Sequence, residues 1–206
     1  TVSATFNNSF FNNNQLTIQN TGSGTGTFTI AAGGFDNNGT ITVNADLTFN
    51  SPAGFANFGT IDVNANLLVT SSSGTNDTGA NINIAVDQTL DLDVTTFTND
   101  GTITLLGGSS GTTLDLTDVT TFTNNGTLTG SGTVVNSGVI TNNGTFTVSP
   151  GASPGLLNFD GDLNTSIQLE TELEGLAPGT GYDQVVVGGV ANLGSSSMDV
   201  ILLNEQ

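Results

Sequence analysis

The chain has 206 residues and a formal net charge of −18 at pH 7, because it contains 18 Asp and Glu residues and no Lys, Arg or His. Cys is also absent, so disulfide bonds and catalysis by cysteine, histidine or lysine are excluded. A surface without basic side chains repels nucleic acid, whose binding depends on Lys and Arg. No apolar stretch of about 18 residues is present, so the sequence predicts no membrane insertion.

A short pattern recurs along residues 1–148. An apolar residue, most often Phe, precedes an Asn-rich corner and a strand of alternating Thr and apolar residues. The clear copies are residues 35–43, 55–63, 97–105, 122–129 and 140–148. Two weaker copies, 11–18 and 77–84, align when Gln15 and Gly79 are placed at the position of the corner glycine. The aligned positions 15, 39, 59, 79, 101 and 126 are then spaced 24, 20, 20, 22 and 25 residues apart.

Each repeat contains short strands that cannot bury an apolar face alone. Thr-Ile-Thr-Val at residues 40–43 alternates polar and apolar side chains, as a strand with one buried face does. A second strand follows in several repeats, at residues 47–49, 67–69, 90–92 and 114–116. Stacking the repeats buries these faces, so the pattern predicts an all-β protein with a parallel β-helix, or β-solenoid. The corner asparagines are expected to stack as hydrogen-bonded ladders. A β-sandwich or barrel built from hairpins with Asn-Gly turns is the alternative.

The pattern changes near residue 150. Two of the four prolines lie in residues 149–155, and longer strands are predicted around residues 167–174, 185–187 and 198–203. We therefore divide the chain into solenoid coils at 1–148 and a C-terminal β-rich module at 149–206. The module either continues the solenoid or caps it.

This C-terminal region resembles the end of autotransporter-like passengers, which are secreted bacterial β-helix surface proteins. The matching segments are residues 130–134, 143–145, 149–155, 159–163, 178–187 and 189–193. The resemblance covers about residues 130–203, and it implies a right-handed β-helix at the cell surface or released from it, with an adhesive or scaffolding role. It transfers no catalytic residues. Unlike such passengers, this chain has no Lys or Arg.

Calcium is the ion that the composition favours, because carboxylates, Asn carbonyls and turn backbone supply the oxygen ligands it prefers. No cofactor is required by any motif. The candidate ligands form three pairs without an EF-hand pattern: Asp91 and Asp93, Asp115 and Asp118, and Asp160 and Asp162. Diffuse screening by monovalent ions is the alternative.

Catalysis is not expected. Carboxylate pairs could in principle hydrolyse glycosides, and the candidates are Asp91 with Asp93 and Glu170 with Glu172 and Glu174. Both sets alternate with leucines along a strand, which favours solvent-facing positions without a catalytic role.

The sequence thus predicts a secreted, extracellular structural protein, a β-solenoid subunit that assembles head to tail with copies of itself into a filament, sheath or matrix. The segment expected to add to a neighbour as a strand is Thr1, Val2, Ser3, Ala4, Thr5 and Phe6. A monomeric adhesin or carbohydrate-binding rod that contacts cell-surface glycans is the alternative.

Overall fold

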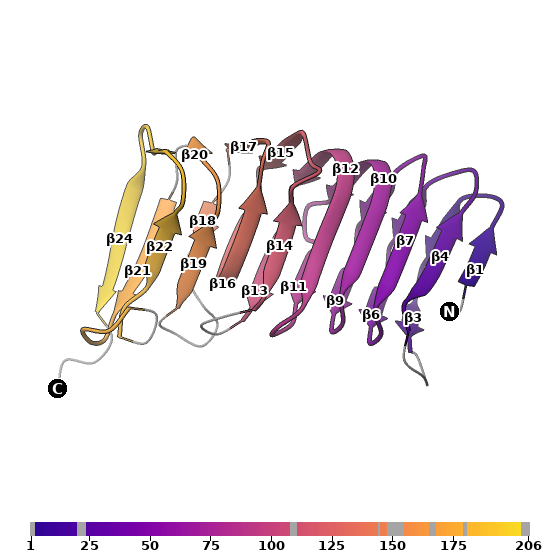
Figure 1. Ribbon diagram of the computed structural model, residues 1–206, viewed down its shortest axis with the longest axis horizontal. Coiled ribbons are helices and arrows are strands. Elements are labelled where there is room, and N and C mark those ends of the chain that lie inside the picture. Colours follow the sequence, from indigo (N-terminus) through magenta and orange to yellow (C-terminus); the bar gives the residue numbers. More distant parts are fainter. Residues whose placement is uncertain are drawn as a thin grey trace.

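The computed structural model describes residues 3–19, 24–107, 111–143, 145–147, 155–164, 168–178 and 181–202. These residues form β-strands without any helix, and all paired strands are parallel. The strands lie side by side along the long axis of a rod, with the N-terminal end at the right of Figure 1 and the C-terminal end at the left. The chain is therefore a β-solenoid, as the repeat pattern predicted.

Three ladders of strands run along the rod. The first is β1 (Ser3–Phe6), β4 (Gly26–Ile30), β7 (Leu47–Ser51), β10 (Leu67–Asn76), β12 (Thr89–Asn99), β14 (Thr113–Leu116), β16 (Thr127–Asn136), β19 (Leu156–Phe159) and β22 (Gln184–Val187). The second, at the corner, is β2 (Phe10–Asn12), β5 (Phe35–Asn37), β8 (Phe55–Asn57), the ends of β10 and β12, β15 (Thr121–Asn124) and β17 (Val139–Asn142).

The third ladder closes each coil. It is β3 (Gln15–Ile18), β6 (Thr40–Val43), β9 (Thr60–Val63), β11 (Asn81–Ile84), β13 (Thr102–Leu106), the start of β16 and β18 (Thr145–Thr147). At the C-terminal end, two smaller sheets pair β20 (Leu163–Asn164) with β23 (Ala191–Asn192) and β21 (Gln168–Leu173) with β24 (Ser197–Leu202). The parallel pairing rules out the hairpin alternative, because hairpin strands are antiparallel.

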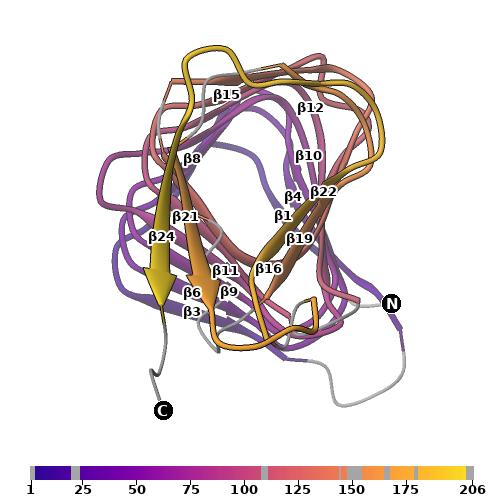
Figure 2. The ribbon, with the colours of Figure 1, turned by 90° about the vertical axis from the view of Figure 1, so that its left-hand side faces the viewer.

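The coil is right-handed. Figure 2 looks along the rod from its C-terminal end, and from β22 the chain passes over the top of the view to β24 on the left. It therefore turns anticlockwise while it advances toward the viewer, which is the right-handed sense.

The core is a set of columns in which like residues stack. In the third ladder, Ile41, Ile61, Ile82, Ile103 and Leu128 lie in register and are all buried. Their neighbours Thr40 and Thr42 remain half exposed. Alternation along each strand thus places apolar side chains inside and Thr outside.

Phenylalanine rings form a second column at the corner. Phe35 stacks on Phe10 and Phe55 with ring centroids 5.5 and 5.7 Å apart. The next rung is Gly74, which lies in register with both Phe55 and Phe97. A Cβ atom on Gly74 would lie 2.6 Å from the Phe97 ring, so the ring occupies the space that a side chain would need.

The corner glycine is required by close approach of neighbouring coils. A Cβ atom on Gly39 would lie 1.9 Å from the carbonyl oxygen of Asn14, and one on Gly59 would lie 2.0 Å from that of Gly39. No side chain fits at such distances.

In the two weak repeats, the predicted position of the corner glycine is wrong by one residue. Thr40 pairs with Gln15 and Thr60 pairs with Asn81, so Asn14 and Ala80 occupy the corner-glycine position in place of Gln15 and Gly79. Likewise Phe10, not Phe11, pairs with Phe35. Adjacent Phe residues hid the true register in the first copy. In the other copy, four positions separate Asn76 from Ala80 where two separate Asn57 from Gly59.

The region after residue 148 shares the first ladder with the coils before it. β19 pairs with β16, and β22 pairs with β19. The division of the chain at residues 148 and 149 stays a prediction.

Candidate functional site

A ladder of buried asparagines runs through the corner of the rod. In six successive pairs, the side-chain Nδ2 of one asparagine donates to the Oδ1 of the asparagine in the next coil over 2.6–2.7 Å. The members are Asn12, Asn37, Asn57, Asn76, Asn99, Asn124 and Asn142. The five from Asn37 to Asn124 have no exposed surface. The expected ladder of corner asparagines is therefore confirmed.

The second Nδ2 hydrogen of most rungs also has a partner. Asn37 donates to the carbonyl of Thr60 over 3.0 Å, and Asn99 donates to that of Thr127 over 3.1 Å. Since an unpaired buried polar group costs about 1–3 kcal/mol, each rung is stable only while the next coil is in place. The ladder therefore links the register of one coil to that of its neighbour.

The N-terminal end of the rod presents strand edges. Within the described ranges, β1, β2 and β3 each pair on one side only, with β4, β5 and β6. Their outer edges therefore carry N–H and C=O groups available to another strand. Of the segment predicted to add to a neighbour, Ser3, Ala4, Thr5 and Phe6 form β1, whereas Thr1 and Val2 lie outside the described residues.

The C-terminal end is also uncovered. β22, β23 and β24 pair with β19, β20 and β21, and no described strand lies beyond them. On β24, Met198 and Leu202 are 59% and 63% exposed. They share the inward parity of Val200, whose register partner Thr171 is buried. Inward-facing apolar side chains thus lie bare at this end.

The predicted calcium ligands Asp91 and Asp115 lie directly opposite each other on β12 and β14. Burial raises the pKa of Asp91, and the nearby carboxylates of Asp115, Asp118 and Asp93 raise it further. The carboxylate of Asp115 already accepts hydrogen bonds from the backbone N–H and the hydroxyl of Thr117, at 2.9 and 2.6 Å. These acidic side chains therefore form a repulsive stripe on the outer surface.

The pair Asp160 and Asp162 lies in the bend after β19, and both residues are exposed. Oδ1 of Asp162 accepts a hydrogen bond from the backbone N–H of Val190 at 2.7 Å, which joins this bend to the loop after β22. Over the described part of the chain, no group of three or more acidic side chains could hold a metal ion. Calcium binding stays a prediction.

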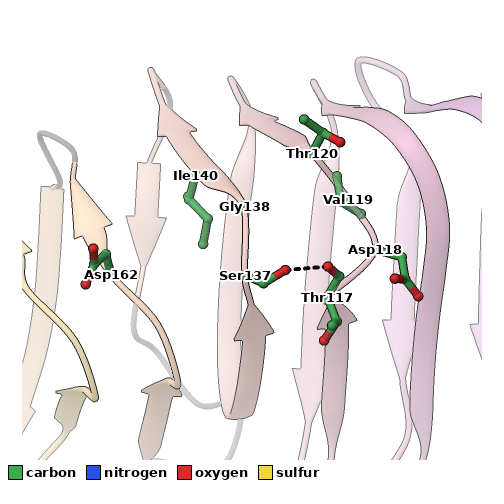
Figure 3. A pocket seen from close by; sticks show the side chains of 8 residues that line it. All are labelled: Thr117, Asp118, Val119, Thr120, Ser137, Gly138, Ile140 and Asp162. Carbon is green, nitrogen blue, oxygen red and sulfur yellow. Dashed lines mark hydrogen bonds between the residues drawn. The ribbon is translucent and has the colours of Figure 1, made fainter.

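A polar groove of about 660 Å³ lies on the side of the rod, where bends of successive coils meet. Its lining residues are Thr117, Asp118, Val119, Thr120, Ser137, Gly138, Ile140 and Asp162. The Ser137 hydroxyl donates to the carbonyl of Thr117 at the centre of Figure 3. Asp118 and Asp162 lie at opposite ends of the groove, so they do not converge on one point.

The carboxylates considered for catalysis lie on strands. Asp91 and Asp93 alternate with the buried Leu90 and Leu92 on β12 and face outward. On β21, the backbone of Glu170 is described but its side chain is not, and Glu174 is exposed after the strand ends. The absence of an enzymatic role stays a prediction.

Comparison with models of known protein families, with curated proteins and with solved structures yields no match. No helix in the described residues is long and apolar enough to cross a membrane. The functional argument therefore rests on the geometry of the rod.

Sequence reasoning missed two of these features. The side groove forms from bends about 20 residues apart, and no local motif marks it. The exposed β24 residues have the same alternation as buried strands, so only the missing neighbouring coil distinguishes them.

Proposed function

We propose that the protein is an extracellular structural subunit, a β-solenoid that assembles head to tail with copies of itself into a filament, sheath or matrix. The observation that carries the proposal is the pair of open ends. The outer edges of β1–β3 and β22–β24 have no described strand beyond them, and the apolar side chains of Met198 and Leu202 on β24 are exposed. Stacking one end on the other satisfies both, and this heterologous contact generates an open fibre rather than a ring.

Composition supports an extracellular role without catalysis. A chain without Lys and Arg contains no cleavage site for trypsin-like proteases. This property suits a material that persists outside the cell. The net charge of −18 opposes close approach of copies, so assembly should improve when salt or divalent cations screen the carboxylates.

The test is negative-stain electron microscopy of the purified chain, with calcium and with a chelator. Filaments whose width matches one rod support the proposal, and dependence on calcium supports the predicted cation sites. Isolated short rods in low salt, high salt and calcium alike would contradict self-assembly.

The side groove favours a second candidate, an adhesin that binds glycans. Hydroxyl and carboxylate groups of Thr117, Ser137 and Asp162 line it, and these are groups that hydrogen-bond to sugars. No aromatic residue lines it, so the stacking contact common in sugar sites is missing. Binding on a glycan array that is lost in the Ser137→Val variant would support this role.

A further inference from the structure

The third ladder presents two files of polar side chains on its outer surface. Outward positions alternate with the buried residues of each strand, and the register aligns them from coil to coil. The first file is Gln15, Thr40, Thr60, Asn81, Thr102 and Thr127. The second file is Thr17, Thr42, Asp62, Asn83, Thr104 and Thr129. All of these residues are exposed or half-exposed. The surface is therefore a repeating array in which most positions are threonine.

The backbone fixes the spacing of this array. Neighbouring strands lie about 4.8 Å apart, and the two files lie about 6.6 Å apart, since each residue of a strand adds about 3.3 Å. Threonine is branched at Cβ, so its χ1 angle is restricted and its hydroxyl and methyl groups take few positions. The surface therefore repeats in two directions and has little side-chain freedom to lose on contact with a regular solid.

This face is nearly free of charge in a chain that carries 18 acidic residues. Asp62 is the one acidic residue in the two files, and its Oδ1 accepts a hydrogen bond from Nδ2 of Asn83 at 2.9 Å. The first ladder lies on another side of the rod in Figure 2, and its outer surface carries Asp91 and Asp115 in register. The two surfaces share the same backbone repeat, but one presents hydroxyl and methyl groups where the other presents carboxylates.

Ice is the solid that fits the threonine files. Oxygen atoms on the prism faces of hexagonal ice form a rectangular grid whose two repeats are close to the two spacings of the array. Hydroxyl groups hold water at such positions by hydrogen bonds, and methyl groups order the water between them. A carboxylate fits poorly, because removing a charge from liquid water is unfavourable. Crystalline polysaccharide fits less well than ice, since neither file contains an aromatic ring on which a sugar could stack.

We propose that the outer face of the third ladder binds ice through the ordered water that its threonine files hold. This function goes beyond self-assembly and does not depend on it, because the face lies along the side of the rod and is complete in one copy. Head-to-tail assembly would lengthen the files and add contacts without changing the chemistry of each contact.

The first test makes one substitution on two different surfaces. Thr104→Tyr places a ring in the second file, between Asn83 and Thr129. Thr133→Tyr makes the same change on the first ladder, where Thr133 is also half-exposed. Tyrosine is favoured in strands, so both variants should keep the fold, which circular dichroism checks. The readouts, on dilute protein, are thermal hysteresis and the fraction of protein that slowly growing ice takes up.

We expect ice to take up the wild type, and the wild type to show hysteresis. Thr104→Tyr should lose more than about half of both signals, because contact along the files is multivalent and a raised ring separates its neighbours from the lattice. Thr133→Tyr should match the wild type. Equal losses in the two variants, or exclusion of the wild type from ice, overturn the proposal. Filaments that ice excludes overturn ice binding and leave self-assembly intact.

The second test completes the second file. Asp62→Thr combined with Asn83→Thr places threonine at each of its described positions and removes its one charge. Asp36→Thr is the control, because it removes the same charge from β5, which belongs to the corner ladder. The double variant should raise hysteresis at least about twofold, since more contacts join the multivalent surface. The control should leave it unchanged. No gain in the double variant, or an equal gain in the control, overturns the proposal.

Discussion

The middle of the rod and its C-terminal end use the same alternation of side chains but differ in burial. On β13 the inward residues Ile103 and Leu105 have at most 1% of their surface exposed, whereas on β24 Met198 and Leu202 are more than half exposed. In a solenoid, the inward side chains of each coil are buried by contact with the neighbouring coils. Exposure at β24 therefore marks a missing neighbour, not a weak strand pattern.

The strongest test of this comparison removes one rung from the middle. In Asn99→Ala, the Nδ2 group of Asn76, the Oδ1 atom of Asn124 and the Thr127 carbonyl each lose a partner. We expect the free energy of unfolding in urea to fall by about 3 kcal/mol or more, since each unpaired buried group costs about 1–3 kcal/mol. Asn125→Ala is the control, because the hydrogen bonds that its side chain donates to Asp100 and accepts from Asn143 are both exposed, and it should cost less than about 0.5 kcal/mol. Similar losses in the two variants would contradict the role given to the buried ladder.

A second change tests the packing of the Phe column. Gly74→Ala places a Cβ atom against the Phe97 ring, and we expect a loss of about 1–3 kcal/mol from overpacking. Adding Phe97→Leu should make room for the new methyl group. The double variant should then be more stable than the sum of the two single losses predicts, which a double-mutant cycle measures. Strict additivity would show that the ring and the methyl group do not compete for space.

The acidic stripe in the middle of the rod provides a third, smaller effect. The folded state raises the pKa of Asp91 above its ordinary value of 3.8, so ionisation of this carboxyl weakens the fold at neutral pH. Asp91→Asn should therefore raise the free energy of unfolding at pH 7 by up to about 1 kcal/mol. The gain should shrink as the pH falls through the raised pKa toward 3.8, because Asp91 then becomes neutral in the wild type.

Asp36→Asn is the matched control for this change, because Asp36 pairs with Phe11 and Ala56 and has no acidic register partner. Its effect on unfolding should be close to zero. An Asp91→Asn gain that is constant from neutral to acid pH would exclude charge repulsion as its cause.

The smallest effect is expected at the open end. Leu202→Ser removes a side chain that is already exposed, so the stability of the monomer should change by less than about 0.5 kcal/mol. Leu105→Ala, at a buried position in the middle, should cost about 2–5 kcal/mol. Thermal unfolding of dilute, unassembled protein measures both. A large loss from Leu202→Ser would mean that β24 is covered in the monomer.

Much of this architecture follows from local patterns. Thr-Ile-Thr-Val at β6 and its equivalents predicted one buried face, and the recurrence of Asn before the corner predicted the ladder. The sequence alignment of the repeats is wrong by one residue in two copies. One contains the adjacent Phe10 and Phe11, and the other has a longer corner before Ala80. Adjacent residues of the same type and corners of different length leave register ambiguous, because register is decided by pairing with another coil.

The sequence by itself determined the parallel stacking of coils, since each repeat is too short to bury its own apolar face. It also determined the absence of basic and thiol chemistry. Only the tertiary structure decided which asparagine meets which, the direction in which the ladder donates, the side groove between bends and the bare residues of β24. The physical reason is that these features depend on contacts between coils, which lie about 20 residues apart in the chain but only about 4.8 Å apart in space.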